Sequence, residues 1–236
     1  MSLAIFSAKN TYLGLGVAVF FMASTACSAK SPALIKKNNV ETTVETTKVS
    51  ADPVKPGRGN PVLGKEKSEL CQGCHGEDGN SPDSMTPKLA GQNASYITKQ
   101  LRNYQVGTRS HQIMSDIAAT SRDEDLDDIS AYFASRPQMK GNGAVNKLGK
   151  DLYLRGDMSR MIVACVNCHG ANGEGKSNID YIFPVIGGQH KDYLLGQFNS
   201  FKAGDRSNSP GGVMNIMVQK MSAAEIEALA DYVSGL

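Results

Sequence analysis

The sequence predicts an all-α fold made of two similar small helical domains in tandem. PKLAGQNASYITKQLRNYQVGTR, which begins at Pro87, is repeated from Pro184 as PVIGGQHKDYLLGQFNSFKAGDR. The Pro, Gly-Gln, Tyr, Gln, aromatic, Gly and Arg positions match at a constant offset of 97. A second stretch that begins at Met114 is repeated from Met214 at an offset of 100. Two copies of one unit indicate two domains of the same kind.

Each copy ends in a predicted amphipathic helix, because apolar residues follow an i, i+3, i+7 spacing. These residues are Leu126, Ile129 and Phe133 in the first copy and Ile226, Leu229 and Val233 in the second. Ser222 and Glu225 predict a capping box at the start of the second helix. The aligned pair in the first copy is Arg122 and Asp125, so the start of that helix is less well defined.

An acidic run at residues 123–128 opens this first terminal helix. We expect it to complement the positive end of the helix dipole and to face solvent, since charge runs usually form solvated faces. A docking surface for a basic partner is the alternative.

Composition places the chain among ordinary globular proteins. Its 236 residues are 40% hydrophobic and 20% charged, which leaves room for one large domain or two small ones. The formal net charge is only +2, and no run is rich in Lys and Arg, so no nucleic-acid partner is expected.

Residues 1–27 are predicted to be a signal peptide. Lys9 supplies a positive charge, and the apolar run TYLGLGVAVFFMASTA begins at Thr11 and ends in small residues. That run is short for a membrane-spanning helix, although a retained N-terminal anchor helix is the alternative. Export would place the mature chain in an oxidising compartment.

The sequence has five cysteines, and four of them form two closely spaced pairs, Cys71 with Cys74 and Cys165 with Cys168. Cys27 is the one left over. The STAC sequence that contains it resembles the lipobox of bacterial lipoproteins, although Ser24 stands where that motif usually has Leu. Lipidation of Cys27 is therefore expected, with contact to a membrane through this anchor. Ordinary cleavage near Ala26 or Ala29 is the alternative.

The remaining chain divides into four predicted segments. Residues 28–61 lack a sustained periodicity and are predicted to form a flexible tether, although VETTVETT within them has the pattern of an edge strand. The first domain covers 62–135 and the second 148–236, and the Pro-, Gly- and Asn-bearing segment 136–147 connects them.

Each domain carries one CxxCH motif. Cys71, Cys74 and His75 form the first, and Cys165, Cys168 and His169 form the second. On a helical turn, residues at i, i+3 and i+4 share a face. Two thiols and an imidazole in this arrangement are the attachment signature of c-type haem: the thiols form thioethers and the histidine binds iron. A CxxC disulfide and a four-thiol zinc site are the alternatives, and neither requires His-Gly after both pairs.

The sixth iron ligand decides between electron transfer and catalysis, because a closed site favours the former. Met114 and Met214 are the favoured ligands, since they occupy the same place in both copies. Met217, His111 and His190 are the rivals, and none of them has an identical partner in the other copy.

The chain resembles the dihaem cytochromes c of the cytochrome c4 type, which are two fused class I cytochrome c domains. The resemblance rests on CQGCHG and CVNCHG, PKLAGQ and PVIGGQ, YFAS, and GKDLYLRG with ACVNCHG, and it covers residues 61–236. It implies two covalent haem c groups with His and Met as iron ligands. It also implies an electron carrier between a quinol–cytochrome c oxidoreductase and a terminal oxidase at the periplasmic face of the membrane.

The same resemblance implies further site residues. The carbonyls of Pro87 and Pro184 would hold His75 and His169. Tyr104 and Phe201 would form part of the walls around the haems. Arg109 and Arg206 would contact haem propionates. Plain packing and surface charge are the alternative for the last four. The competing function classes are a dihaem peroxidase or dehydrogenase with one open haem, and a dedicated electron-transfer subunit of another enzyme.

Overall fold

The structure is a computed structural model, and it describes residues 59–178 and 180–236. The predicted signal peptide, Cys27, the VETTVETT segment and almost all of the tether lie outside the described residues. Within the described part, no helix has both the length and the apolar character needed to cross a bilayer.

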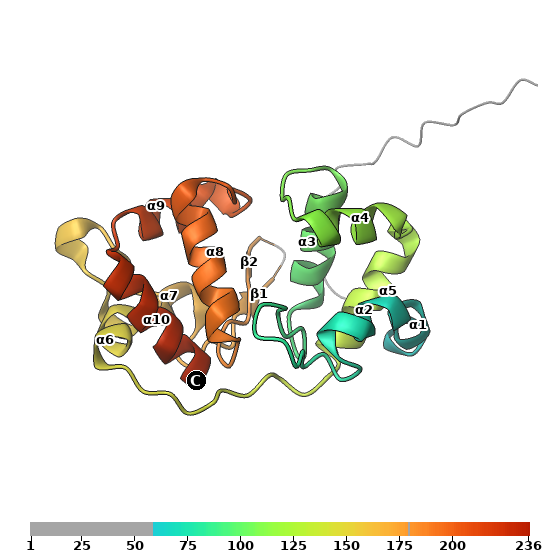
Figure 1. The fold of residues 1–236 in the computed structure, drawn as a ribbon, viewed down its shortest axis with the longest axis horizontal. Helices are drawn as coiled ribbons and strands as arrows, with labels where there is room; N and C mark the ends of the chain where they lie inside the picture. The colour runs from blue at the N-terminus through green and yellow to red at the C-terminus, as the bar shows by residue number, and fades with distance from the viewer. Residues whose placement is uncertain (1–58, 179) are drawn as a thin grey trace, which may run out of the picture. The chain divides into compact units, whose positions relative to one another are not determined.

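The predicted all-α class is confirmed (Figure 1). The first half, residues 59–135, contains α1 (Pro61–Lys67), α2 (Glu69–His75), α3 (Ala94–Gln105), α4 (Gln112–Thr120) and α5 (Asp123–Ala134). The second half, residues 147–236, contains α6 (Lys147–Arg155), η1 (Met158–Arg160), α7 (Val166–His169), α8 (Lys191–Ala203), η2 (Pro210–Gly212), α9 (Val213–Gln219) and α10 (Ala223–Gly235). A two-stranded antiparallel ribbon, β1 (Lys176–Ser177) and β2 (Ile182–Phe183), is added to the helices of the second half.

In each half the first helix packs closely against the last, α1 against α5 and α6 against α10 (Figure 1). A glycine makes both crossings possible. A Cβ added to Gly64 would lie 1.9 Å from the Asp128 carbonyl oxygen, and one added to Gly149 would lie 1.9 Å from that of Ala228. The two helix backbones therefore touch at these points.

The apolar stripes of α5 and α10 face the two hydrophobic cores. All six predicted residues are buried, and none has more than 4% of its surface exposed. The predicted capping box of α10 is present, with Ser222 and Glu225 bonding reciprocally. In α5 the aligned residue Arg122 is the N-cap, and its guanidinium pairs with Asp125 in place of a side-chain cap.

Three carboxylates of the acidic run in α5 contact neighbouring helices, where the sequence predicted a face exposed to solvent. Lys67 of α1 forms ion pairs with Asp125 at 2.8 Å and with Asp128 at 2.5 Å, and Asp127 accepts a hydrogen bond from Thr98 of α3. These carboxylates therefore tie α5 to its neighbours in the first half, as well as lying near the positive end of its dipole.

The second half has a hairpin that the first half lacks. Sixteen positions separate Gly149 from Cys165, against seven between the equivalent Gly64 and Cys71. In the extra chain, Asp157 and Ile162 exchange two backbone hydrogen bonds of 2.7 and 2.8 Å.

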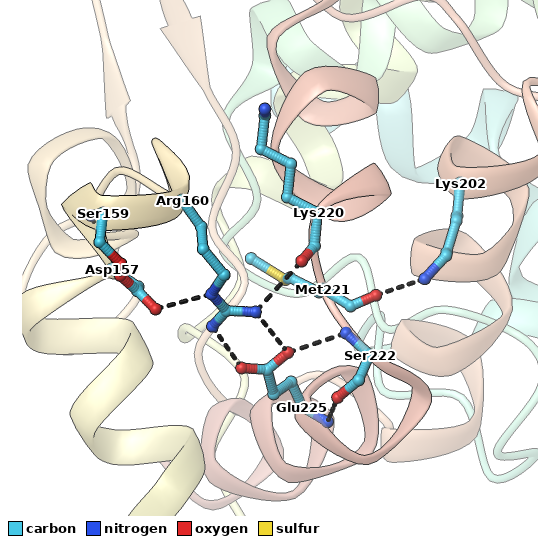
Figure 2. A network of polar contacts seen from close by, with 8 residues as sticks. All are labelled: Asp157, Ser159, Arg160, Lys202, Lys220, Met221, Ser222 and Glu225. Carbon is cyan, nitrogen blue, oxygen red and sulfur yellow. Dashed lines mark hydrogen bonds and ion pairs between the residues drawn. The ribbon is translucent and has the colours of Figure 1, made fainter.

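An ion-pair network fastens this hairpin to the start of α10 (Figure 2). The Arg160 guanidinium donates to Asp157 within the hairpin at 2.6 Å and to both oxygens of Glu225 at 2.5 and 3.1 Å. It also donates to the Lys220 carbonyl oxygen at 3.2 Å. The hydrogen bonds from Arg160 lower the pKa of Glu225 to about 2, so this carboxyl is charged at neutral pH.

Replacing Glu225 with Gln should lower the free energy of unfolding at pH 7 by about 1 kcal/mol, because Arg160 loses a charged partner. The pKa of Glu225 is depressed in the folded state, from an ordinary value of 4.5 to about 2. Its stabilising effect is therefore present above pH 4.5 and lost as the pH falls towards 2. Urea unfolding followed by circular dichroism measures the free energy of unfolding of both proteins. The difference between wild type and Glu225→Gln should shrink as the pH falls from 4.5 towards 2.

Glu227→Gln is the matched control, since Glu227 lies in the same helix and its side chain is 63% exposed. Among the described residues its carboxylate forms an ion pair with Lys191 alone. We expect no measurable change in it at any pH. A gap between Glu225→Gln and wild type that stays constant from pH 7 to pH 2 would contradict this account of the network.

Candidate haem sites

Both CxxCH motifs form a helical turn, as predicted. The first lies within α2, so Cys71, Cys74 and His75 share one helix face. The second occupies α7 together with its N-cap residue, Cys165. In both motifs the two sulfur atoms and the imidazole therefore start from neighbouring positions of one short helix.

The glycine after each histidine ends the helix. Gly76 and Gly170 have φ values of +82° and +85°, in the region that favours glycine. A Cβ on Gly76 would also lie 2.7 Å from the Asn80 carbonyl oxygen, so the chain turns away immediately after His75. This explains why Gly follows His in both motifs.

The two histidines are buried and held by proline carbonyls, as predicted. The Nδ1 atom of His75 lies 2.8 Å from the Pro87 oxygen, and that of His169 lies 3.0 Å from the Pro184 oxygen. Because a carbonyl only accepts, Nδ1 carries the proton and Nε2 keeps a lone pair for a metal. Burial lowers the pKa of both imidazoles, against the opposing effect of the carbonyls, so they stay neutral.

The four cysteines of the described residues are free thiols, which does not support the disulfide alternative. Burial raises the pKa of Cys71, and it raises the pKa of Cys165 to about 11. Burial therefore favours the protonated thiol at both positions. Across residues 59–178 and 180–236, no group of three or more His, Cys, Asp or Glu side chains is placed to hold a metal ion.

Met114 and Met214 occupy matching places beside the two motifs. Met114, in the first turn of α4, packs with Cys71 against the core of the first half. Met214, in the first turn of α9, packs against the core of the second half, as does Cys165. Both thioethers are partly buried and lie against the same apolar cluster as the first thiol of the motif in their own half.

Each rival ligand has another role in the structure. His111 is the N-cap of α4, where its Nδ1 accepts the Met114 N–H at 3.3 Å. His190 lies 2.9 Å through Nε2 from the Ser81 carbonyl oxygen. The Met217 sulfur accepts the N–H of Val163 at 3.3 Å, which joins α9 to the chain just before Cys165.

Arg109 and Arg206 are buried, with 7% and 8% of each residue exposed. Each guanidinium lies over the aromatic ring that the resemblance places at a haem wall. Arg109 is 4.8 Å from the Tyr104 ring centre, and Arg206 is 4.4 Å from that of Phe201. In the described part of the chain neither arginine forms an ion pair with a carboxylate. Buried cations normally have an anionic partner, so the pair fits a bound anionic group such as a haem propionate.

The two arginines join the halves through a crossed set of hydrogen bonds. Each donates to the glutamine of its own half, Arg109 to Gln100 at 2.7 Å and Arg206 to Gln197 at 2.6 Å. Each also donates to a tyrosine hydroxyl of the opposite half. Arg109 reaches Tyr193 at 3.1 Å, and Arg206 reaches Tyr96 at 2.9 Å.

The electrostatic effect of this network is visible at Tyr96. Burial by itself raises the pKa of a tyrosine, yet the pKa of Tyr96 lies below its ordinary value because Arg206 and Arg109 lie beside it. The two guanidinium groups therefore favour negative charge at the centre of the network.

Sequence reasoning did not assign roles to the partners of these arginines. The tyrosines and glutamines repeat at the same offset of 97 as the rest of the motif, so the repeat did mark them. It did not reveal that each contacts the opposite half, because a repeat gives equivalence and not contact.

Comparisons with known proteins identify the family of this chain. The Cytochrome c family model matches residues 147–236. Cytochrome c4 of Pseudomonas aeruginosa is 36% identical over 181 residues, which cover 75% of this chain and 89% of that protein. The chain belongs to the cytochrome c4 family. The crystal structure of reduced recombinant cytochrome c4 from Pseudomonas stutzeri superposes with a TM-score of 0.70 at 36% identity, covering 75% of this chain and 99% of the other.

Another relative is the thiosulfate dehydrogenase electron acceptor of Stutzerimonas stutzeri. It is 36% identical over 168 residues, which cover 69% of this chain and 76% of that protein. The name of this second relative describes it as an electron acceptor.

Membership of the cytochrome c4 family confirms the predicted cofactors and class of activity. Cytochromes c4 are periplasmic dihaem electron-transfer proteins and not enzymes. They bind two covalent haem c groups with His and Met as iron ligands. The free thiols, the neutral buried imidazoles and the partly buried thioethers fit that cofactor. So do the two buried arginines, which form no ion pair with a carboxylate among the described residues.

Proposed function

We propose that this protein carries electrons in the periplasm from a quinol-oxidising complex to a terminal oxidase or reductase. The observation that supports this most is the equivalence of the two sites, which offer the same donors at matching places in both halves. A dihaem peroxidase or dehydrogenase needs one haem that differs from the other.

In this proposal Cys71 and Cys74 hold the first haem through thioethers, and His75 and Met114 bind its iron. In the second half, Cys165 and Cys168 hold the haem through thioethers, and His169 and Met214 bind its iron. When bound, the haems supply the Fe(III)/Fe(II) couple, whose potential His/Met ligation raises. The prolyl carbonyls fix the ring orientation of the two histidines, and the apolar cores exclude water from the sites.

Arg109 and Arg206 are proposed to bind propionates. Arg206→Leu should then lower the midpoint potential of the haem in the second half by about 50 mV, or ~1 kcal/mol, because a nearby positive charge favours electron uptake. A redox titration followed by absorption measures this. Arg122→Leu is the control, since the Arg122 side chain is 68% exposed. An unchanged potential in Arg206→Leu would contradict the propionate role.

The second candidate is a dedicated electron-transfer subunit, and the similarity to thiosulfate dehydrogenase electron acceptors favours it. Stopped-flow reduction of the oxidised holoprotein separates the two. A quinol–cytochrome c oxidoreductase that reduces it much faster than a thiosulfate dehydrogenase with thiosulfate supports the respiratory carrier, and the opposite order supports the subunit.

We further propose that Cys27 is lipidated and that residues 28–61 tether the protein to a membrane. Mass spectrometry of the mature N-terminus tests this directly. A diacylglycerol-modified Cys27 supports the tether, and an unmodified start near Ser28 or Lys30 would contradict it.

A further inference from the structure

Gln92 and Gln189 are buried amides at equivalent positions of the repeat, each with 5% of the residue exposed. Gln92 donates through Nε2 to the Val185 carbonyl at 2.8 Å and accepts the Val185 N–H through Oε1 at 2.8 Å. Gln189 does the same with Lys88, at 2.9 and 2.9 Å. Each glutamine therefore binds both backbone groups of one residue in the opposite half.

The residues bound in this way directly follow the two prolines that hold the histidines. The N–H of Val185 and the carbonyl of Pro184 belong to one peptide group, and that carbonyl accepts the His169 Nδ1 proton at 3.0 Å. The same relation connects Lys88 and Pro87 with His75, at 2.8 Å. Only one planar peptide group and two hydrogen bonds thus separate each glutamine from the imidazole of the opposite half.

We propose that Gln92 is a positioning residue for His169 and that Gln189 is a positioning residue for His75. This inference rests on the proposed function, in which these histidines are the iron ligands. Each half would thereby set the orientation and the electron donation of the histidine ligand in the other half.

Two physical effects act through the shared peptide group. The peptide N–H donates a hydrogen bond to the glutamine Oε1, and this increases the negative charge on the carbonyl oxygen of the same peptide group. The more negative oxygen then accepts a stronger hydrogen bond from the histidine Nδ1–H. The clamp on N–H and C=O also fixes the plane of the peptide, and with it the direction in which the imidazole points. A stronger Nδ1–H bond makes the imidazole a better electron donor and favours the oxidised iron.

The glutamine side chains are themselves fixed. Oε1 of Gln92 also accepts the N–H of Asn93 at 3.0 Å, and Oε1 of Gln189 accepts that of His190 at 2.9 Å. Each glutamine Oε1 is therefore held by a backbone N–H of its own half while the side-chain amide binds a residue of the other half. A side chain that served only to fill the interface would not need this orientation.

The test uses the full dihaem protein with Gln92→Met or Gln189→Met, which keep the side-chain length and remove the hydrogen bonds. Proton NMR of the oxidised protein resolves haem methyl signals, and Met114→Ala and Met214→Ala assign them to the two halves. Redox titration gives the two midpoint potentials. We expect Gln92→Met to shift the signals and raise the potential of the second-half haem and to leave the first unchanged, and Gln189→Met to do the reverse.

Gln92→Glu is the rescue variant, because a carboxylate still accepts the Val185 N–H. It should keep the potential of the second-half haem at or below the wild-type value. Equal shifts of both haems, a shift in the mutated half alone, or no shift would overturn the inference and leave the proposed function intact. Absence of His/Met signals in the unmodified protein would instead overturn the proposed function, and the inference with it.

Discussion

Met114→Ala and Met214→Ala should each convert one of the two haems from a low-spin to a high-spin or water-ligated form. The midpoint potential of the affected haem should fall by on the order of 0.1 V or more, because a thioether ligand favours ferrous iron. Absorption near the thioether-to-iron charge-transfer band and a redox titration measure the two effects. Each variant should leave the haem of the other half in its original spin state.

Met217→Ala is the matched control in the second half. Met217 lies one turn after Met214 in α9, and its sulfur accepts the Val163 N–H. Removing it should cost about 1 kcal/mol of stability and leave both spectra unchanged. A loss of low-spin haem in Met217→Ala, with Met214→Ala unaffected, would show that the ligand of the second half is Met217.

Gly149→Ala should destabilise the second half by about 3 kcal/mol, and Gly64→Ala should do the same in the first half. The added methyl group would lie 1.9 Å from a carbonyl oxygen of the facing helix, and helix backbone yields much less readily than a side chain. α6 would be forced away from α10, or α1 from α5. Urea unfolding followed by the Soret band of each haem measures the loss.

Gly196→Ala provides the control, because Gly196 lies inside α8. Apart from the backbone of α8 and its chain neighbours, no atom of the described residues lies within 4 Å of a Cβ added there. Alanine there should stabilise the helix by roughly 0.5–1 kcal/mol. Stabilities of Gly149→Ala and Gly196→Ala that both match or exceed the wild type would contradict the proposed contact between α6 and α10.

The features that sequence analysis could predict are local or repeated. The helical turn of each CxxCH motif follows from its spacing, and the burial of Leu126 and Leu229 follows from a helical period. The repeat also separated Met114 and Met214 from the other methionines. It did so because a ligand needed in both halves must occur in both copies.

What could not be predicted depends on contacts between residues about 100 positions apart. The repeated Gly-Gln does not reveal that Gln92 binds Val185, since the same letters are compatible with a contact inside one half. The ion pair between Arg160 and Glu225, which holds the hairpin, could likewise not be predicted. The two residues are 65 positions apart, and the sequence predicted only a capping role for Glu225. Such pairings are set by how helices pack, and no short-range spacing encodes them.

The central claim is that two equivalent His/Met sites make this protein an electron carrier with no open haem. The absorption spectrum of the reduced holoprotein, recorded at neutral pH with and without carbon monoxide, tests it most directly. An unchanged spectrum is the predicted result, because both irons would have strong ligands on both sides. Prompt binding of carbon monoxide at either haem would contradict the claim, since it would reveal an open coordination position.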